Sequence, residues 1–504
     1  MLKTNASNPK GCFTGAIIRI KVVILMKNNY GFDIYTTYKN VSKSLYTAHN
    51  PLQFNDAAFK VFNDDLANAL SLNTKQLNTP HGCQFMLANT DTPIFSPIAL
   101  AYAGHQYGHF NILGDGRAHL LFEHKHENTL YDIQLKGSGP TVYSRGFDGR
   151  ATLRSALLEY LMSEAMFALN IPTTRSLAVI ETNDKIERIG PQDAGVLVRI
   201  AKSHLRVGTF ELIHYKDDIG TLKKLANYAI FRHDKDLMNK ENIYLAWYER
   251  IIARQAKLVA LWQSVGFVHG VMNTDNTTIS GETIDYGPCA FIDQYDLKAV
   301  YSSIDSKGRY AYGNQPYIAS WNLAKLGLAI LPLIDKDKSR AINLVQSALE
   351  RFGHLFEGYY YQIMANKLGY EVKNNTDIAL IDKLLALLEK YASDYTVTFR
   401  ALTDQNYLNN ALFNSQAFLD WEMTWKKRIK DEKKPFDQMK KSNPVVIPRN
   451  HLVKHALDQA CNEKNFETFD TLLKIVQNPF DKNIPQAFKE VPTTHKPYVT
   501  YCGT

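Results

Sequence analysis

The sequence has 504 residues, which is long enough to bury a large core and to form two or three domains. Hydrophobic residues make up 45% and charged residues 21% of it, close to the averages for folded proteins, which excludes wholesale disorder and fibrous repeats. The formal net charge of +8 is small for this length and indicates a polyanionic partner only weakly.

The cysteines are widely separated and form no C-x-x-C pair, which argues against a zinc site and against the disulfide framework of a secreted protein. A reducing compartment fits this pattern best, so we expect a cytoplasmic protein. The five cysteines are Cys12, Cys83, Cys289, Cys461 and Cys502.

The first apolar segment, residues 16–26, contains Arg19 and Lys21 and is too short to span a bilayer. We therefore expect no membrane partner. A weak signal peptide is one interpretation, but no small-residue cleavage site follows the segment. We favour the other interpretation, in which translation starts at Met26 and residues 1–25 are an upstream extension.

The middle of the chain begins with a β-rich pattern. Short β-prone runs at residues 118–122 and 131–135 flank a polar turn at 125–128 and predict a hairpin. Apolar residues then recur at helical spacing over residues 150–169 and predict a helix. Two further strands are predicted at residues 176–181 and 195–200.

Beyond about Asn242 the pattern becomes mainly helical. A small β-rich half therefore precedes a larger helical half, and the predicted fold class is α+β. No repeat of fixed period appears, which argues against solenoids and propellers. The helices predicted in this half span residues 243–265, 319–331, 338–352, 378–391, 418–430 and 452–461.

A basic stretch covers residues 426–442, with paired lysines at 433–434 and 440–441. We interpret it as a solvated linker or an exposed helix end. A nucleic-acid-binding arm is the alternative, but no aromatic platform or known binding module accompanies the stretch, so no nucleic-acid partner is expected.

Glycines are dense in the segment YAGHQYGHFNILGDGRA, residues 102–118. Glycine lets backbone N–H groups approach an anion such as phosphate. The segment matches neither the phosphate loop of nucleotide-binding proteins nor the kinase glycine-rich loop, and glycine-rich hairpins are often simple turns. By itself it is a weak signal for phosphate binding.

Lys136 closes a predicted strand, and Glu159 lies in the middle of the helix that follows. In protein kinases a strand lysine paired with a helix glutamate holds the nucleotide phosphates. Taken alone, the two residues could equally be a surface lysine and a solvated glutamate.

The segment HGVMNTDN, residues 269–276, has the spacing of the kinase catalytic loop, and Asp285 begins a D-x-G sequence after it. The position of the kinase base, two residues after His269, is occupied by Val271, which cannot accept a proton. Asp275 is the acid inside this loop. A strand lysine, a helix glutamate, a loop asparagine and a D-x-G aspartate in this order are hard to obtain by chance.

These motifs resemble the selenoprotein O (YdiU) family, from about Phe32 to the C-terminus. The segments that carry the resemblance are YAGHQYG, LGDGRA, QLKGSGPTVYSR, LEYLMSEAM, IPTTRSLAV, VLVRIAKSHLRVGTFE, GFVHGVMNTDN, TIDYGP, QPYIASWNLAKL, NPVVIPRNHLV and the terminal YCGT. The family is a pseudokinase by motif. It binds ATP in a flipped orientation and transfers AMP to Ser, Thr or Tyr hydroxyls of proteins, and pyrophosphate leaves.

The resemblance implies a two-lobed, protein-kinase-like fold with a β-rich N-lobe, a helical C-lobe and a C-terminal helical extension. An N-terminal segment would span residues 26–95. The N-lobe would follow at 96–215, the C-lobe at 216–400, and the basic linker with a helical tail at 401–504.

The resemblance also implies roles for individual residues. Asp275 would be the catalytic base, and Lys136 would contact phosphate and pair with Glu159. Asn276 and Asp285 would bind Mg²⁺ or Mn²⁺. His269 is expected to be a packed histidine that shapes the loop. The implied ATP-binding residues are Gly114, Gly116, Arg117, Lys136, Asp148, Gly149, Arg199, Arg206 and Asp285.

One feature departs from the family pattern. The resemblance implies a redox partner for Cys502 in the stretch after D-x-G, but residues 291–305 contain no cysteine. Cys289 is the nearest candidate, and an inert terminal thiol is the alternative.

Three other functions stay open at this point. They are an ordinary γ-phosphate kinase, a non-catalytic pseudokinase scaffold, and transfer of UMP from UTP.

Overall fold

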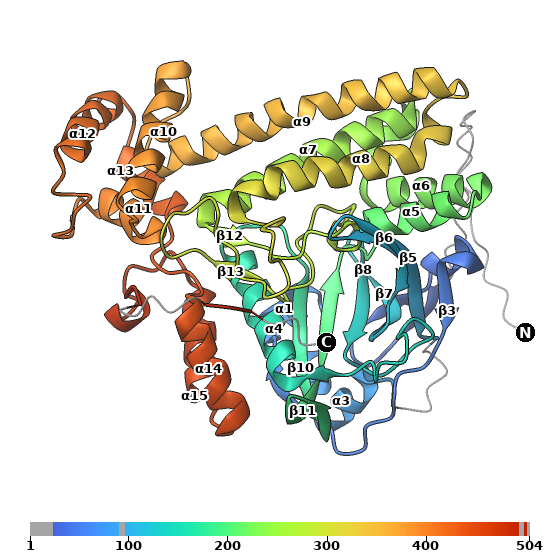
Figure 1. Cartoon of the computed structure of the whole chain (residues 1–504). Coiled ribbons are helices and arrows are strands. Elements are labelled where there is room, and N and C mark those ends of the chain that lie inside the picture. Colours follow the sequence, from blue (N-terminus) through green and yellow to red (C-terminus); the bar gives the residue numbers. More distant parts are fainter. Residues whose placement is uncertain (1–23, 90–95, 493–497, 501–504) are drawn as a thin grey trace, which may run out of the picture.

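The computed structural model describes residues 24–89, 96–492 and 498–500. Cys12 and Cys502 and most of the expected upstream extension lie outside these ranges. A β-sheet region formed by the first part of the chain packs against a helical region formed by the second part (Figure 1). This mixed architecture confirms the predicted α+β class and is consistent with a two-lobed, kinase-like fold.

The described strands of the first region form one 11-stranded sheet with the main order β1-β2-β7-β8-β11-β10-β4. Off this path, β5 pairs with β3, β6 and β7, and β9 pairs with β11. All the pairings between these strands are antiparallel. The strands are β1 Ile24–Lys27, β2 Asp33–Tyr35, β3 Tyr46–Ala48, β4 Ala58–Phe62, β5 Ile98–Gln106, β6 His109–Gly114, β7 Ala118–His126, β8 Thr129–Lys136, β9 Ala151–Thr152, β10 Arg175–Arg188 and β11 Gly190–Ala201.

The predicted hairpin is present as β7 and β8. Alternation along β8 explains how the sheet separates its core from its polar face. Ile133 and Leu135 are fully buried in the core cluster on one side, whereas Gln134 and Lys136 belong to the other side. Two short helices, α1 Asp64–Ala69 and α3 Pro80–Met86, contribute residues to the same core cluster as Ile133 and Leu135.

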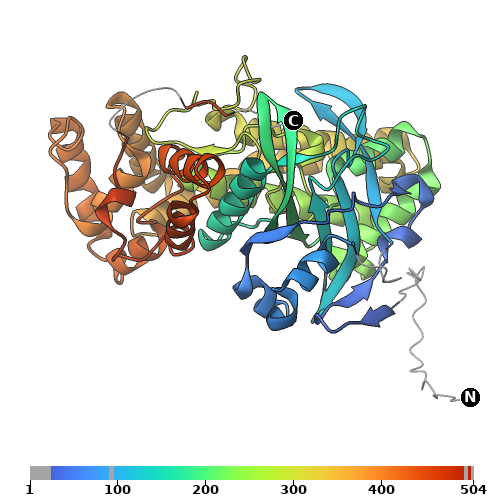
Figure 2. The same cartoon turned by 90° about the horizontal axis from the view of Figure 1, so that it is seen from below.

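Helix α4, Leu153–Ala168, packs against β10 and β11 (Figures 1 and 2). It coincides with the helix predicted over residues 150–169. The Thr152 side chain caps its N-terminus by accepting a hydrogen bond from the Ser155 N–H. Helices α14, Asn450–Asn462, and α15, Glu467–Val476, belong to the C-terminal extension and pack on α4, so this extension contacts the β-rich region.

The centre of the helical region is α7, Ile243–Val265, whose bounds match the prediction. Asn242 caps its start, and Gly266 ends it with a left-handed φ of 75°. Helix α9, Lys338–Lys367, is twice as long as its predicted range because its apolar stripe continues beyond Phe352. The other long helices are α5 Val207–Tyr215, α6 Ile219–His233, α8 Gln315–Ile334, α10 Asn375–Lys390, α11 Tyr395–Asp404, α12 Gln416–Ile429, α13 Pro435–Ser442, α14 Asn450–Asn462 and α15 Glu467–Val476.

The structure adds helices that the sequence pattern did not reveal. Helices α5, α6, α11 and α15 were not predicted. The basic stretch 426–442 contains the end of α12 and all of α13, and Met439 within it is fully buried. This part of the chain therefore packs against the helical region on one side.

Among the described residues, one stretch, Tyr312–Ile334, is long and apolar enough to cross a membrane by length and composition. Half of its apolar window is buried inside the protein. Leu323, Leu326 and Ile330 of this stretch are fully buried in the main core cluster, as expected of a core helix.

Candidate active site

Lys136 lies between two carboxylates. Its Nζ is 2.5 Å from Oε2 of Glu159 on α4 and 2.5 Å from Oδ1 of Asp285 in the D-x-G segment. Lys136 lies on β8, Glu159 on α4 and Asp285 in the D-x-G loop of the helical region. Glu159 and Asp285 follow Lys136 by 23 and 149 residues in the sequence, and the fold brings the three side chains together. The contact between Lys136 and Glu159 is the one that the kinase pattern predicted.

Arg199 of β11 extends this network. Its guanidinium lies 3.2 Å from Oε1 of Glu159 and donates a hydrogen bond of 2.5 Å to Oε1 of Gln134. Arg199 is 3% exposed, so its charge is compensated by Glu159 rather than by water.

Asp285 is held in its charged form by this cluster. Burial alone would raise the pKa of its carboxyl group, but the positive charges of Lys136, Arg117 and Arg199 outweigh burial and hold the pKa far below its ordinary value. Asp285 also has a left-handed φ of 68°, which is uncommon for a residue with a side chain and is typical of functional sites.

The loop that precedes Asp285 is fixed by buried hydrogen bonds. The backbone N–H of His269 donates to Oε1 of Gln315, and Nε2 of His269 lies 2.9 Å from the carbonyl of Ile284. Asn322 of α8 donates to the carbonyl of Met272 and to the hydroxyl of Thr277. His269 is 1% exposed and burial lowers its pKa, which suits a packed, neutral imidazole.

Val271 occupies the kinase base position and is buried. Asp275 lies in the same loop, and its Oδ1 atom is buried without a hydrogen-bond partner among the described residues. Its other oxygen accepts a hydrogen bond of 3.4 Å from Gln106. Gly104 passes so close that a Cβ there would lie 2.5 Å from Oδ1 of Asp275, so only glycine fits at this point of β5.

The environment of Asp275 raises its pKa to about 6. Burial is the main cause; Arg206 acts in the opposite direction, and the nearby negative charge of Asp285 adds to the effect of burial. A carboxyl group with a pKa near 6 is ionised at neutral pH and still basic enough to accept a proton.

The tip of the β5–β6 hairpin is fastened to this loop, which the sequence reasoning missed. Oδ1 of Asn273 accepts hydrogen bonds from the Tyr107 N–H at 3.2 Å and from the hydroxyl of Tyr310 at 2.6 Å. The N–H of His105 donates to the hydroxyl of Thr274 at 2.7 Å. The dense YAGHQYG motif marked this hairpin, but its partners are remote in the sequence and gave no local signal.

The hairpin is also supported from the helical region. Nδ1 of His105 lies 2.6 Å from Oε1 of Glu211 on α5, and the His105 ring makes an edge contact with Trp321 of α8. These contacts hold the glycine-rich hairpin against the loop that contains Asp275.

Gly114, Gly116 and Arg117 lie at the turn between β6 and β7. The segment 137–150 folds over this turn: Thr141 donates to the carbonyl of Asp115, and Ser144 donates to the carbonyl of Gly116. A Cβ on Gly114 would lie 2.3 Å from the ring of Tyr143, so this contact also requires glycine.

Gly149 and Asp148, the other two residues of this segment that the resemblance assigns to ATP binding, lie in different surroundings. Gly149 lies inside it, because its carbonyl accepts a hydrogen bond from the Gly139 N–H. Asp148 instead pairs with Arg188 at 2.8 Å and is partly exposed. The Asp148 carboxylate is thus engaged away from Lys136 in this structure.

Arg206 precedes α5 and is 5% exposed. Its guanidinium lies 3.3 Å from Oδ1 of Asp115 and 4.3 Å from the centre of the Tyr102 ring. Its Nε atom finds no hydrogen-bond partner among the described residues. A buried arginine with an unused donor is suited to hold an anion.

The residues present fit a magnesium or manganese ion that is shared with a substrate. No group of three or more His, Cys, Asp or Glu residues in the described part of the chain could hold a metal ion on its own. Asn276 and Asp285 are neighbours, since Nδ2 of Asn276 lies 3.3 Å from Oδ2 of Asp285. One or two oxygen ligands completed by substrate phosphates are the usual coordination of Mg²⁺ in phosphate-transfer sites.

Cys289 is 1% exposed, and burial raises the pKa of its thiol. Thr500 lies beside it in the fold, because its hydroxyl donates a hydrogen bond to the carbonyl of Pro288. Cys502 lies outside the described residues, so a Cys289–Cys502 pair stays a prediction.

The fold and these contacts define a protein-kinase-like site in which a strand lysine joins a helix glutamate to the aspartate of a D-x-G segment. A family model described as "Protein adenylyltransferase SelO" matches residues 30–477. The chain belongs to this family, and it is an enzyme of the nucleotidyltransferase class.

Curated relatives agree with this assignment. The chain is 46% identical over 481 residues to the protein nucleotidyltransferase YdiU of Clostridium perfringens (strain SM101 / Type A), covering 94% of this chain and 98% of that protein. It is 45% identical over 485 residues to the protein nucleotidyltransferase YdiU of Bacillus mycoides, covering 95% and 99% of the two chains. The corresponding protein of Clostridium botulinum (strain Eklund 17B / Type B) is also 45% identical, with 95% and 98% covered.

Proposed function

We propose that the protein transfers AMP from ATP to the hydroxyl groups of Ser, Thr or Tyr side chains of other proteins. The hydroxyl oxygen forms a bond with the α-phosphorus, the bond from that phosphorus to the pyrophosphate oxygen breaks, and pyrophosphate leaves. The hydroxyl proton passes to the carboxylate of Asp275. The family assignment and the names of the relatives support a protein acceptor.

The proposal depends mainly on where the acidic residue lies in the loop: at position 275 and not at the kinase base position, 271. The residue at the kinase base position is the buried Val271, whereas the acid of the loop, Asp275, has a buried oxygen without a described partner. A base displaced along the loop favours attack at a phosphorus other than the γ-phosphorus. This agrees with a nucleotide bound in the flipped orientation that the family resemblance implies.

The charged residues divide between the phosphates and the metal ion. Lys136, Arg199 and Arg206 would bind phosphate oxygens, with Gly114, Gly116, Arg117 and Gly149 lining the nucleotide site. Asn276 and Asp285 would hold Mg²⁺ or Mn²⁺, which when bound neutralises negative charge on the phosphates. Asp148 would reach the nucleotide only after it leaves Arg188.

Three alternatives are compatible with the same fold. Transfer of UMP from UTP would use the same phosphate-binding and metal-binding residues with a different nucleotide base. An ordinary γ-phosphate kinase needs a base at position 271, which valine cannot supply. A non-catalytic scaffold would not need the complete set of Lys136, Glu159, Asn276 and Asp285. We also propose a reducing compartment such as the cytoplasm, because the five cysteines of the sequence are widely separated and form no C-x-x-C pair.

The experiment that tests the proposal compares ATP labelled at the α-phosphorus with ATP labelled at the γ-phosphorus, each with Mg²⁺ or Mn²⁺ and acceptor proteins. We expect label on protein from α-labelled ATP only. Label from γ-labelled ATP would favour the kinase, and α-labelled UTP in parallel distinguishes UMP transfer.

A further inference from the structure

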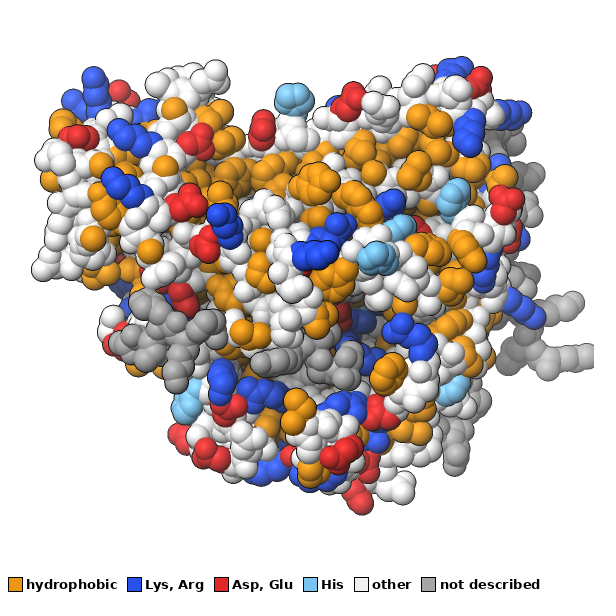
Figure 3. Space-filling view, in the orientation of Figure 1, with side chains coloured by type: hydrophobic (Ala, Val, Ile, Leu, Met, Phe, Trp, Pro, Cys, Tyr) orange, Lys and Arg blue, Asp and Glu red, His pale blue; other side chains and the backbone are white. Residues whose placement is uncertain are grey.

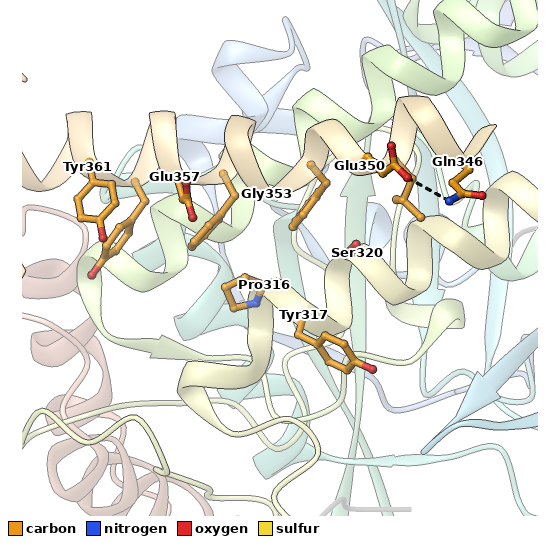
Figure 4. Close-up of a pocket in the computed structure, with 12 residues that line it drawn as sticks. Pro316, Tyr317, Ser320, Gln346, Glu350, Gly353, Glu357 and Tyr361 are labelled. Carbon is orange, nitrogen blue, oxygen red and sulfur yellow. Dashed lines mark hydrogen bonds between the residues drawn. The ribbon is translucent and has the colours of Figure 1, made fainter. Parts of the chain in front are cut away.

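A groove runs between α8 and α9, away from the cluster around Lys136 (Figure 4). It encloses about 630 Å³ and is lined by the first turns of α8 and the middle of α9. Its volume lies in the range of sites that bind ligands or peptide side chains.

Five of the twelve residues that line the groove are aromatic. Phe352, Phe356 and Tyr360 follow one another along one face of α9, with ring centroids 6.4 and 5.6 Å apart and nearly parallel planes. Tyr317 of α8 lies at the edge of the groove, with its ring pointing away from α9 in Figure 4 and 68% of its surface exposed. Hydrophobic side chains gather over α8 and α9 in the space-filling view (Figure 3). Such a patch is typical of a surface that binds another protein.

The rim of the groove is acidic. Glu350 and Glu357 are both exposed lining residues, and the lining residues that the structure describes include neither Lys nor Arg. A partner with Lys or Arg beside its apolar side chains would therefore complement this surface, whereas an acidic partner would be repelled.

The groove has a fixed position relative to the reacting groups. Gln315, at the start of α8, accepts a hydrogen bond from the His269 N–H, and Asn322 of the same helix bonds to Met272. Pro316, Tyr317 and Ser320 line the groove from the same stretch of helix. A protein held in the groove is thus held at a constant distance from the loop that contains Asp275.

We propose that this groove docks a segment of the protein substrate in which large apolar side chains lie next to Lys or Arg, at a distance from the hydroxyl that receives the nucleotide. The inference rests on the proposed function, because it assumes a protein acceptor. Docking at a remote groove raises the local concentration of the acceptor hydroxyl near Asp275 and leaves nucleotide binding unaffected.

The chain offers a matched pair of variants to test this docking. Gly353 lines the groove, and Gly358 lies on the same helix but does not line it. A Cβ at either position would meet no heavy atom of the described chain within 4 Å, so both glycines accept a larger side chain. We expect Gly353→Trp to fill the groove and Gly358→Trp to leave it open, while thermal melting shows both variants folded.

Binding is measured with a fluorescein-labelled amphipathic peptide that has Leu and Phe on one face and two flanking Lys. Gly353→Trp should raise its Kd by at least about tenfold, as expected when the centre of an interface is blocked. Gly358→Trp should leave the Kd unchanged, and Glu357→Lys should weaken binding of this peptide. The same peptide with Glu in place of Lys should bind more weakly to the unaltered protein.

Transfer is measured with a longer peptide in which a flexible linker joins this segment to a tail that contains Tyr. Gly353→Trp should raise the KM for this acceptor and leave kcat and the KM for ATP unchanged. Equal peptide binding by Gly353→Trp and Gly358→Trp would overturn the docking proposal, and so would an unchanged acceptor KM. A shift from dimer to monomer by Gly353→Trp in sedimentation would assign the groove to a second copy of the chain instead. Failure of the unaltered protein to transfer α-label would refute the proposed function, while the peptide-binding result would still decide whether the groove binds this class of segment.

Discussion

The raised pKa of Asp275 leads us to expect that this residue affects the stability of the protein as well as its activity. Its folded-state pKa of about 6 lies above its ordinary value of 3.8, so the charged form is disfavoured in the folded protein. The native state therefore binds more protons than the unfolded state between these values, and the group costs stability as pH rises through this window. At pH 7.5 the cost approaches about 3 kcal/mol, from roughly 1.4 kcal/mol for each unit of pKa shift.

Replacing Asp275 with Asn removes the charge and keeps nearly the same shape. We expect Asp275→Asn to unfold at a higher urea concentration than the unaltered protein at pH 7.5, with a smaller gain near pH 5 and none below about pH 3.8, as the linkage relation requires. The same variant should lose about 10²–10⁴-fold in the rate of transfer, the usual contribution of a positioned base. Stability is measured by urea unfolding in EDTA without nucleotide, and rate by release of pyrophosphate.

Glu282 provides the control, because burial raises its pKa to about 7 although it lies outside the contacts around Lys136 and Asp275. Glu282→Gln should stabilise the protein in a similar way at high pH and retain transfer activity. The reasoning is refuted if Asp275→Asn loses less than about tenfold in rate. It is also refuted if Asp275→Asn is destabilised equally at pH 5 and pH 7.5, because that result would show a structural rather than an electrostatic effect.

Three further predictions concern the surroundings of this residue. Asp285→Ala should abolish transfer and the metal dependence of ATP binding in calorimetry, because a ligand and its negative charge are lost together; persistence of a Mg²⁺-dependent affinity would contradict this role. Tyr310→Phe removes hydrogen bonds to Asn273 and Tyr107, so it should lower the free energy of unfolding in urea by about 1–3 kcal/mol and raise the KM for ATP. Unchanged hydrogen exchange at residues 105–108 in this variant would show that Tyr310 does not hold the β5–β6 hairpin against the loop. Mild oxidation should yield a Cys289–Cys502 linked peptide in mass spectrometry with lower transfer activity, restored by reductant; thiols that stay free would identify Cys502 as an inert terminal cysteine.

Much of the local structure was predictable because the signals for it are short in sequence. The helix at Ile243–Val265 was predicted with its bounds because its apolar period lies between a capping Asn242 and the left-handed Gly266. The Lys136–Glu159 contact was expected because the strand and the helix that carry these residues follow each other in the chain. Helices α5 and α6 were missed, although Asp218 caps the start of α6 and basic residues occupy its last turn.

The sequence by itself determined the order of the motifs: a strand lysine, a helix glutamate, a loop with Asp275 and Asn276, and Asp285 after it. Only the tertiary structure decided how these groups behave. The pKa of Asp275 depends on its burial beneath Gly104, and the position of the glycine-rich hairpin depends on Asn273 and Tyr310, which follow it by more than 160 residues. The groove likewise exists only because α8 and α9 pack side by side. Spacing and periodicity act over a few turns of chain, whereas burial, charge balance and surface shape arise from segments that meet only in the folded molecule.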